Sequence, residues 1–220
     1  AFLSVMKNHG FRVPDGIVLG SDIFTKTVSA NENKQKADDL LHSLAASNAK
    51  ETAEKLSAFY STLTLPDEIK TELSKYIDSE KKYAVRSSGI KEDLSGFSFA
   101  GQYDTFINVS GIDEIAAAVV KCYRSVYSET VLSYLAANAL SATESAMAVI
   151  IEEMVNSDIS GVAFTVNPIS GCDKEIFIEA TAGQGENLVS GKVSAQSYSY
   201  DWWNQKITGS CGELLSEAKI

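Results

Sequence analysis

Apolar side chains recur every three or four residues through much of the first eighty positions, which is the period of an amphipathic helix. Over residues 38–63 this pattern predicts one long helix, with Leu41 and Leu56 on its apolar face. Pro66 ends that pattern, and Asp67 follows it. Proline suits the first turn of a helix and an acid suits the positive end of the helix dipole, so another helix is predicted to begin there.

Beyond residue 80 the pattern changes to short runs of apolar and β-branched residues. Residues 83–88 and 105–109 are predicted strands, and the stretch 89–104 between them contains several glycines and little periodicity. Ser110, with an acid three residues later, resembles the capping box that begins a helix. The apolar positions that follow predict one helix over residues 113–135.

The last third of the chain is rich in valine, isoleucine, phenylalanine and tyrosine, which favour strands. Four strands are predicted there, over residues 147–152, 162–166, 175–179 and 193–200. A helical N-terminal part followed by a mixed sheet favours an α+β fold with two lobes. We expect the first lobe to cover residues 1–155 and the second, β-rich lobe to cover residues 156–220.

The overall charge narrows the choice of ligands. The 220 residues carry a formal net charge of −10, and so acidic a chain repels the phosphates of a nucleic acid. The three cysteines are widely spaced and form no Cys-x-x-Cys pair, so neither a disulfide framework nor a zinc site is indicated. No stretch is long and apolar enough to span a bilayer. These features favour a cytoplasmic protein that binds neither nucleic acid nor membrane.

The predicted strand over residues 83–88 carries Arg86 and leads into the glycine-containing stretch. A guanidinium held by a strand can bind two phosphate oxygens at once, and the serines and backbone N–H groups of such a loop add donors. The Gly-Lys-Ser/Thr ending of a Walker A loop is absent. A phosphate site is therefore one interpretation, and the alternative is a surface turn in which Arg86 pairs with Glu92 or Asp93.

Several segments together share the order and spacing of one family's signature. The first group is Val85-Arg86-Ser87-Ser88, Ser98-Phe99-Ala100-Gly101-Gln102 and Asp104-Thr105-Phe106. The others are Val13-Pro14-Asp15-Gly16, Val149-Ile150-Ile151-Glu152-Glu153-Met154-Val155, Ser160-Gly161-Val162-Ala163-Phe164-Thr165 and Gly183-Gln184-Gly185-Glu186. Across nearly the whole chain they resemble the nucleotide-binding domain of the pyruvate phosphate dikinase and phosphoenolpyruvate synthase family.

The resemblance implies an ATP-grasp-like fold, in which two lobes clasp ATP between them. It places the phosphate-binding loop at residues 84–105 and makes Arg86 the catalytic residue that holds the ATP phosphates. Ser87, Gly101 and Thr105 are implied to lie on the same loop and to bind the nucleotide.

The resemblance also implies that the adenine meets the strand end at Glu152. The backbone of Glu153, Met154 and Val155 would read the adenine edge in the crevice between the lobes. The family often has glutamine at the position of Glu152, and a carboxylate can accept a hydrogen bond from the adenine amino group but can donate none. The alternative for Glu152 is a salt bridge at the end of the strand.

Glu179 is the candidate ligand for Mg²⁺, which usually takes one or two carboxylates plus phosphate oxygens. Glu186 is equally acidic, and a solvated or helix-capping acid is the alternative for both. His9 and His42 are expected to be structural. The family's phosphorylated histidine lies in a separate domain, in a Thr-Ser-His context that this chain lacks.

The function implied by the resemblance is the ATP-binding part of a dikinase. A phosphoryl group would pass from ATP through a histidine of another domain to pyruvate in a third domain, giving phosphoenolpyruvate, AMP and phosphate. The family's Gly-Gly-Lys, Asp-x-Glu and Gln-x-Arg-Pro elements normally flank this span and are not found here at their positions. We therefore expect a piece of a longer protein, incomplete at the C-terminal end of its second lobe and inactive alone. The alternatives are a rifampin- or glucan-type phosphotransferase and, in another class, a non-catalytic nucleotide-sensing module.

Overall fold

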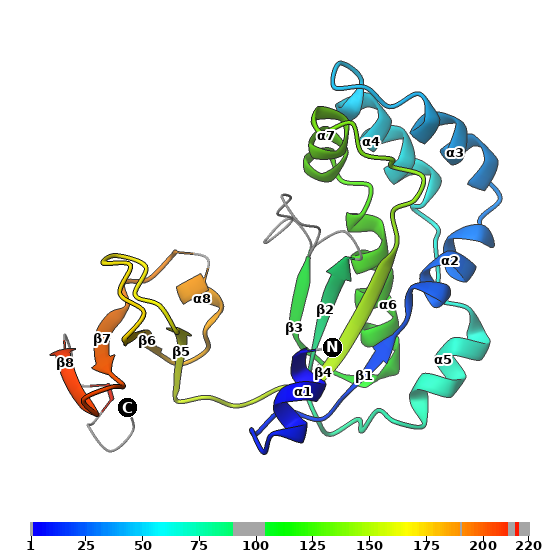
Figure 1. Ribbon diagram of the computed structural model, residues 1–220. Coiled ribbons are helices and arrows are strands. Elements are labelled where there is room, and N and C mark those ends of the chain that lie inside the picture. The colour runs from blue at the N-terminus through cyan, green and yellow to red at the C-terminus, as the bar shows by residue number, and fades with distance from the viewer. Residues whose placement is uncertain (1, 90–103, 190, 211–213, 216–220) are drawn as a thin grey trace. The chain divides into compact units, whose positions relative to one another are not determined.

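The computed structural model describes residues 2–89, 104–189, 191–210 and 214–215. The chain divides into two compact units, Ala1–Met154 (unit 1) and Val155–Ile220 (unit 2) (Figure 1). Among the described residues, no helix has the length and apolar character needed to cross a bilayer.

Unit 1 combines helices with one antiparallel sheet, whose strands lie in the order β1-β4-β2-β3. The strands are β1 (Gly16–Leu19), β2 (Tyr83–Gly89), β3 (Thr105–Val109) and β4 (Met147–Glu153). The helices are α1 (Phe2–Asn8), α2 (Ser21–Ser29), α3 (Lys34–His42), α4 (Ala49–Phe59), α5 (Asp67–Ser74), α6 (Gly111–Ser125) and α7 (Glu129–Ala137).

Helices α2 and α6 pack on one face of this sheet (Figure 1). Alternate residues of a strand point to opposite faces, and Val85, Val149 and Ile151 point from the two central strands into the core, where they are fully buried. Ile115 and Tyr123 of α6 are equally inaccessible. The central strands are therefore held firmly from one side.

The predicted helix over residues 38–63 is in fact two helices, α3 and α4. Asn48 closes the turn between them: its side chain accepts a hydrogen bond from the N–H of Ala45 (2.8 Å) and donates one to the carbonyl of Ser43 (2.9 Å). Asparagine competes in this way with the helical backbone bonds. The apolar period runs on across the turn because both helices pack on the same core.

The predicted helix over residues 113–135 is likewise wrong as one element, because α6 ends and α7 begins within it. Ser128 caps the start of α7, and its hydroxyl accepts a hydrogen bond from the N–H of Val131 (3.3 Å). Such a cap satisfies one of the free N–H groups at a helix start. The chain can therefore change direction there.

The predicted capping box at Ser110 forms only in part. The hydroxyl of Ser110 makes no cap bond, and the carboxylate that accepts from its N–H belongs to Glu114 (3.1 Å), not to Asp113. Asp113 instead forms an ion pair with Lys70 of α5 (2.5 Å). The competing cation explains why the acid three residues after Ser110 does not fold back.

Unit 2 contains a second antiparallel sheet, with the strands in chain order. They are β5 (Ile159–Phe164), β6 (Glu175–Ala182), β7 (Gln196–Asp201) and β8 (Lys206–Ser210), and α8 (Glu186–Val189) lies between β6 and β7. Gln205, with φ of 53°, lies in the turn between β7 and β8. The structure thus confirms a mixed fold of helices and sheets, but both sheets are purely antiparallel where a mixed sheet was predicted.

Candidate functional site

The sheet of unit 1 has a second face, opposite the one on which α2 and α6 pack, which we call the outer face. Arg86 of β2 lies across from Thr105 of β3 and from Ile150 of β4. Ala84 of β2 lies across from Glu152 of β4. Residues paired across a sheet share a face, so these five side chains belong to the outer face. Three predicted site residues are thereby brought together.

Arg86 and Glu152 form an ion pair on the outer face. Nη1 of Arg86 donates a hydrogen bond to Oε2 of Glu152 over 3.0 Å. The Glu152 side chain is 10% exposed and the Arg86 side chain 51%. A carboxylate so deeply buried is costly without a charged partner. The Arg86 guanidinium has five N–H donors, and among the described residues it donates to Glu152 alone. Within the described part of the chain, Arg86 is therefore held at one edge, and its other N–H groups are left for an anion.

Ser87 ties the beginning of β3 to β2. Its hydroxyl donates to the carbonyl of Asp104 (2.8 Å), and its N–H donates to the same oxygen over 3.4 Å. The thiol of Cys122 in α6 donates to it as well, with Sγ 3.7 Å away. The predicted phosphate-binding hydroxyl of Ser87 thus has an internal partner. The hydrogen bonds to the Asp104 carbonyl fix the backbone where the chain returns from the glycine-containing stretch, beside Arg86.

One predicted participant in this stretch cannot be placed with the others. Gly101 lies outside the described residues. So do Glu92 and Asp93, the alternative partners of Arg86. The described part of the predicted loop therefore consists of its two ends, on β2 and at the start of β3.

The strand end predicted to meet the adenine is partly committed to internal hydrogen bonds. The N–H of Glu153 donates to the carbonyl of Asp15, and the N–H of Met154 donates to the carbonyl of Lys82, both over 2.8 Å. Val155 is 59% exposed as a residue, and among the described residues no backbone carbonyl accepts a hydrogen bond from its N–H. In the described part of the chain, this N–H is a backbone donor that the segment can still offer to a base.

Glu179, the candidate metal ligand, lies on β6 in unit 2. It is half-buried, across from Val162 of β5 and Ser197 of β7. Glu186, the other acid considered, is exposed at the start of α8. In the described part of the chain, no three histidine, cysteine or acidic side chains gather closely enough to hold a metal ion. Glu179 therefore offers a single carboxylate.

A cavity of about 500 Å³ in unit 1 is lined by Asp104 and Phe106, the two neighbours of Thr105 in sequence. Lys121 and Arg124 of α6 also line it. Phe106 packs toward the core, so this cavity belongs to the helical side of the sheet and not to the outer face. It is therefore distinct from the surface that carries Arg86.

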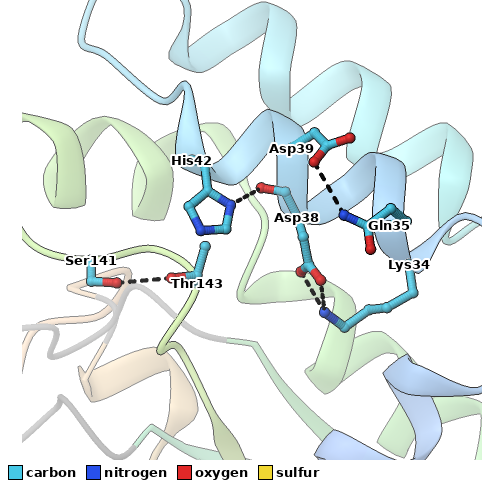
Figure 2. A network of polar contacts seen from close by, with 7 residues as sticks. All are labelled: Lys34, Gln35, Asp38, Asp39, His42, Ser141 and Thr143. Carbon is cyan, nitrogen blue, oxygen red and sulfur yellow. Dashed lines mark hydrogen bonds and ion pairs between the residues drawn. The ribbon is translucent and has the colours of Figure 1, made fainter.

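The two histidines each hydrogen-bond to a backbone carbonyl one helical turn earlier. Nδ1 of His42 lies 2.7 Å from the carbonyl oxygen of Asp38, and Nδ1 of His9 lies 2.8 Å from that of Val5. A carbonyl only accepts, so the proton must lie on Nδ1 in both rings. Figure 2 shows His42 among surface contacts of α3, including the pair of Lys34 with Asp38. This arrangement suits the structural role expected of both residues.

Residues 1–213 match the family model described as the pyruvate phosphate dikinase AMP/ATP-binding domain. A probable phosphoenolpyruvate synthase of Staphylothermus marinus is 33% identical over 214 residues, which covers 91% of this chain and 26% of the relative. A rifampicin phosphotransferase of Bacillus subtilis is 32% identical over 198 residues, or 87% of this chain and 23% of the relative.

The phosphoenolpyruvate synthase of Pyrococcus furiosus is 35% identical over 165 residues, which covers 71% of this chain and 20% of the relative. The chain thus spans about a quarter of the length of the relatives it matches. Because the family model extends over almost all of its residues, the chain belongs to the family of pyruvate phosphate dikinase AMP/ATP-binding domains.

Proposed function

We propose that this chain binds ATP on the outer face of unit 1, as the ATP-binding part of a larger phosphotransferase. The observation that carries the proposal is Arg86, a half-exposed guanidinium fixed on a central strand within the segment that resembles the family's signature. The match to an AMP/ATP-binding domain family supports it. An ATP-grasp-like fold forms part of the same proposal.

In this proposal Arg86 binds the phosphates through the N–H groups that Glu152 leaves open. Thr105, directly across from Arg86, adds a hydroxyl on the same face. Gly101 lets the loop backbone approach the phosphates, and Ser87 holds the end of that loop through Asp104.

The adenine would lie against the strand end from Glu153 to Val155. The N–H of Val155 and the carbonyls of the segment would read its edge. Ala84 and Ile150 give the outer face an apolar part, as most nucleotide and small-molecule sites have.

Mg²⁺ enters the proposal through Glu179 alone. Mg²⁺ in nucleotide sites is typically held by one or two carboxylates, and phosphates and waters supply the remaining oxygens. One carboxylate on a sheet fits that requirement only together with the oxygens of ATP. When bound, the ion would neutralise part of the charge on the phosphates.

For the whole protein we propose dikinase chemistry, in which pyruvate, ATP and water give phosphoenolpyruvate, AMP and phosphate through a histidine on another domain. The contribution of this chain is to position the phosphates and to offset their charge with Arg86. Rifampicin is the second candidate acceptor, because one of the similar proteins is a rifampicin phosphotransferase.

The test of ATP binding is Arg86→Ala in the full-length protein. We expect the affinity for ATP, measured by calorimetry, to fall at least tenfold, about 1.4 kcal/mol, because a charged fork to the phosphates is lost. Arg86→Lys keeps the charge but not the planar fork of N–H donors. Its affinity for ATP should lie between those of the wild type and Arg86→Ala. Unchanged affinity in Arg86→Ala would remove Arg86 from the site.

The matched control is Arg124→Ala. Arg124 is also an arginine of unit 1, but it lies on the helical side, where Nη2 is 3.4 Å from the hydroxyl of Ser57. Its replacement should leave ATP affinity within about twofold. A loss equal to that of Arg86→Ala would show that general charge, and not the outer face, attracts ATP.

The acceptor is tested by measuring AMP released from ATP by the full-length protein. Stimulation by pyruvate with formation of phosphoenolpyruvate supports the dikinase, and stimulation by rifampicin supports the second candidate. ATP binding without either reaction would favour the nucleotide-sensing alternative.

A further inference from the structure

We infer that Glu152 is a positioning residue for Arg86, which holds one edge of the guanidinium so that its other N–H groups meet the ATP phosphates. The inference rests on the proposed ATP binding. It gives Glu152 a role exerted through Arg86, in place of a contact with the adenine amino group.

The neighbouring strands leave room for the Glu152 carboxylate. Directly across from Glu152 are Ala84 on β2 and Gly16 on β1. A Cβ on Gly16 would lie 3.1 Å from Cγ of Glu152 and 2.6 Å from the carbonyl oxygen of Ile151, so no side chain fits there. Small neighbours on both sides let the Glu152 side chain reach diagonally to Arg86, whose direct partner on β4 is two residues away.

The two members of the pair differ in exposure. The difference indicates that Glu152 positions Arg86 and that Arg86 binds the ligand. Glu152 is nine-tenths buried, whereas half of Arg86 is open. Within the described residues, Arg86 is the ion-pair partner of Glu152, and its guanidinium makes no further hydrogen bond there. A buried acid is poorly placed to read a base, while a half-open arginine is well placed to meet an anion.

Fixing a long arginine side chain costs conformational entropy. When a carboxylate already holds the guanidinium, that entropy is lost on folding and not on binding of the nucleotide. Without Glu152, that ordering would fall on the nucleotide and reduce its affinity. The loss should grow with the number of phosphates. A carboxylate that reads adenine predicts the opposite pattern, namely a loss that depends on the amino group of the base.

The experiment compares ATP, AMP and purine riboside triphosphate, which lacks the adenine amino group. Their affinities for the full-length protein are measured by calorimetry with wild type, Glu152→Ala, Arg86→Ala and the double variant. We expect Glu152→Ala to weaken both triphosphates about tenfold and AMP by less than threefold. Once Arg86 is absent, Glu152→Ala should cause no further loss. Glu152→Gln, which keeps an acceptor oxygen at the same reach, should restore part of the affinity.

Two controls separate positioning from loss of structure. Asp113→Asn breaks another ion pair of unit 1, with Lys70, and should leave all three affinities unchanged. The double variant removes both charges, so it leaves no buried carboxylate without a partner. Circular dichroism must show that each variant keeps its helices.

The outcomes distinguish the inference from the proposed function. A Glu152→Ala variant that loses affinity for ATP but not for purine riboside triphosphate would overturn the inference, because Glu152 would then read the base. Equal losses from Glu152→Ala with and without Arg86 would overturn it too. In both cases ATP binding by the wild type, weakened by Arg86→Ala, would still stand. A wild type that binds no ATP would overturn the inference and the proposed function together.

Discussion

Unit 1 and unit 2 each contain a four-stranded antiparallel sheet, but the two sheets are covered very differently. In unit 1, α2 and α6 cover one face and bury a continuous cluster of apolar side chains from helices and strands. In the described part of unit 2, α8 has four residues, and the buried apolar side chains are Phe177, Ala180 and Tyr198.

Unit 2 also leaves many large apolar side chains in solvent. Those at least 38% exposed, apart from Val155 at the junction, are Phe164, Val166, Ile169, Val189, Val193, Trp202 and Trp203. Apolar surface buried on folding stabilises by about 25 cal/mol per Å². A unit that buries little apolar surface therefore gains less stability than one that buries much. Among the described residues, Arg86 and Glu152 therefore lie on the sheet with a large buried core, whereas Glu179 lies on a sheet with few buried apolar side chains.

The largest expected effect comes from a cavity in the core of unit 1. Leu132 of α7 is fully buried, and Leu132→Ala should lower the free energy of unfolding by about 2–5 kcal/mol. Both tryptophans of the chain, Trp202 and Trp203, lie in unit 2, whereas nearly all the helix of the described residues lies in unit 1. During urea unfolding, the circular dichroism transition should therefore shift to lower urea while the tryptophan fluorescence transition stays.

Tyr198→Ala is the converse variant, because Tyr198 is 1% exposed in the sheet of unit 2. It should move the tryptophan fluorescence transition and leave circular dichroism nearly unchanged. If both transitions moved together in both variants, the two units would unfold as one cooperative body, and the contrast between them would be lost.

The sequence predicted the strands and the faces of the helices better than their continuity. The period of apolar positions reports which side of an element faces the core, and it passes unbroken through the turn at Asn48 and the break at Ser128. Those interruptions depend on single side-chain hydrogen bonds. A serine or asparagine within an apolar period is compatible with either a helix interior or a cap.

In the candidate site, the motif placed Arg86 on a strand that the structure also contains, but it could not show its partner. Arg86 and Glu152 are 66 residues apart, and their contact depends on the register of β2 against β4. The partner of Ser87 is a backbone carbonyl, that of Asp104, which no residue type encodes. Gly16 is part of a turn signature, yet its closeness to Glu152 appears only in the folded sheet.

A second contrast between the units concerns alkaline pH, with a smaller expected effect. Burial raises the pKa of the Cys122 thiol from 9.0 to about 12 and that of the Tyr60 hydroxyl from 10.0 to about 12, both in unit 1. The unfolded chain ionises first, so the stability that these neutral groups contribute is complete below pH 9 and is lost between pH 9 and 12. At pH 10, ionisation of the Cys122 thiol in the unfolded chain should by itself lower the free energy of unfolding by about 1.4 kcal/mol.

The measurement is urea unfolding, followed by circular dichroism, between pH 8 and pH 11. Cys122→Ala should flatten the decline of stability with pH, whatever its effect at neutral pH. Cys172→Ala removes a half-exposed thiol of unit 2 and serves as the matched control. An unchanged slope in Cys122→Ala would mean that the thiol is not kept neutral by burial in unit 1.

The smallest effect separates two serines that precede helices of unit 1. The hydroxyl of Ser128 accepts from the N–H of Val131, whereas the hydroxyl of Ser110 makes no cap bond. Ser128→Ala should lower the free energy of unfolding by about 1 kcal/mol, and Ser110→Ala by less than about 0.5 kcal/mol. Both shifts should appear in circular dichroism and neither in tryptophan fluorescence. Equal shifts from the two variants would mean that the hydrogen bond from the Val131 N–H to Ser128 adds no stability to unit 1.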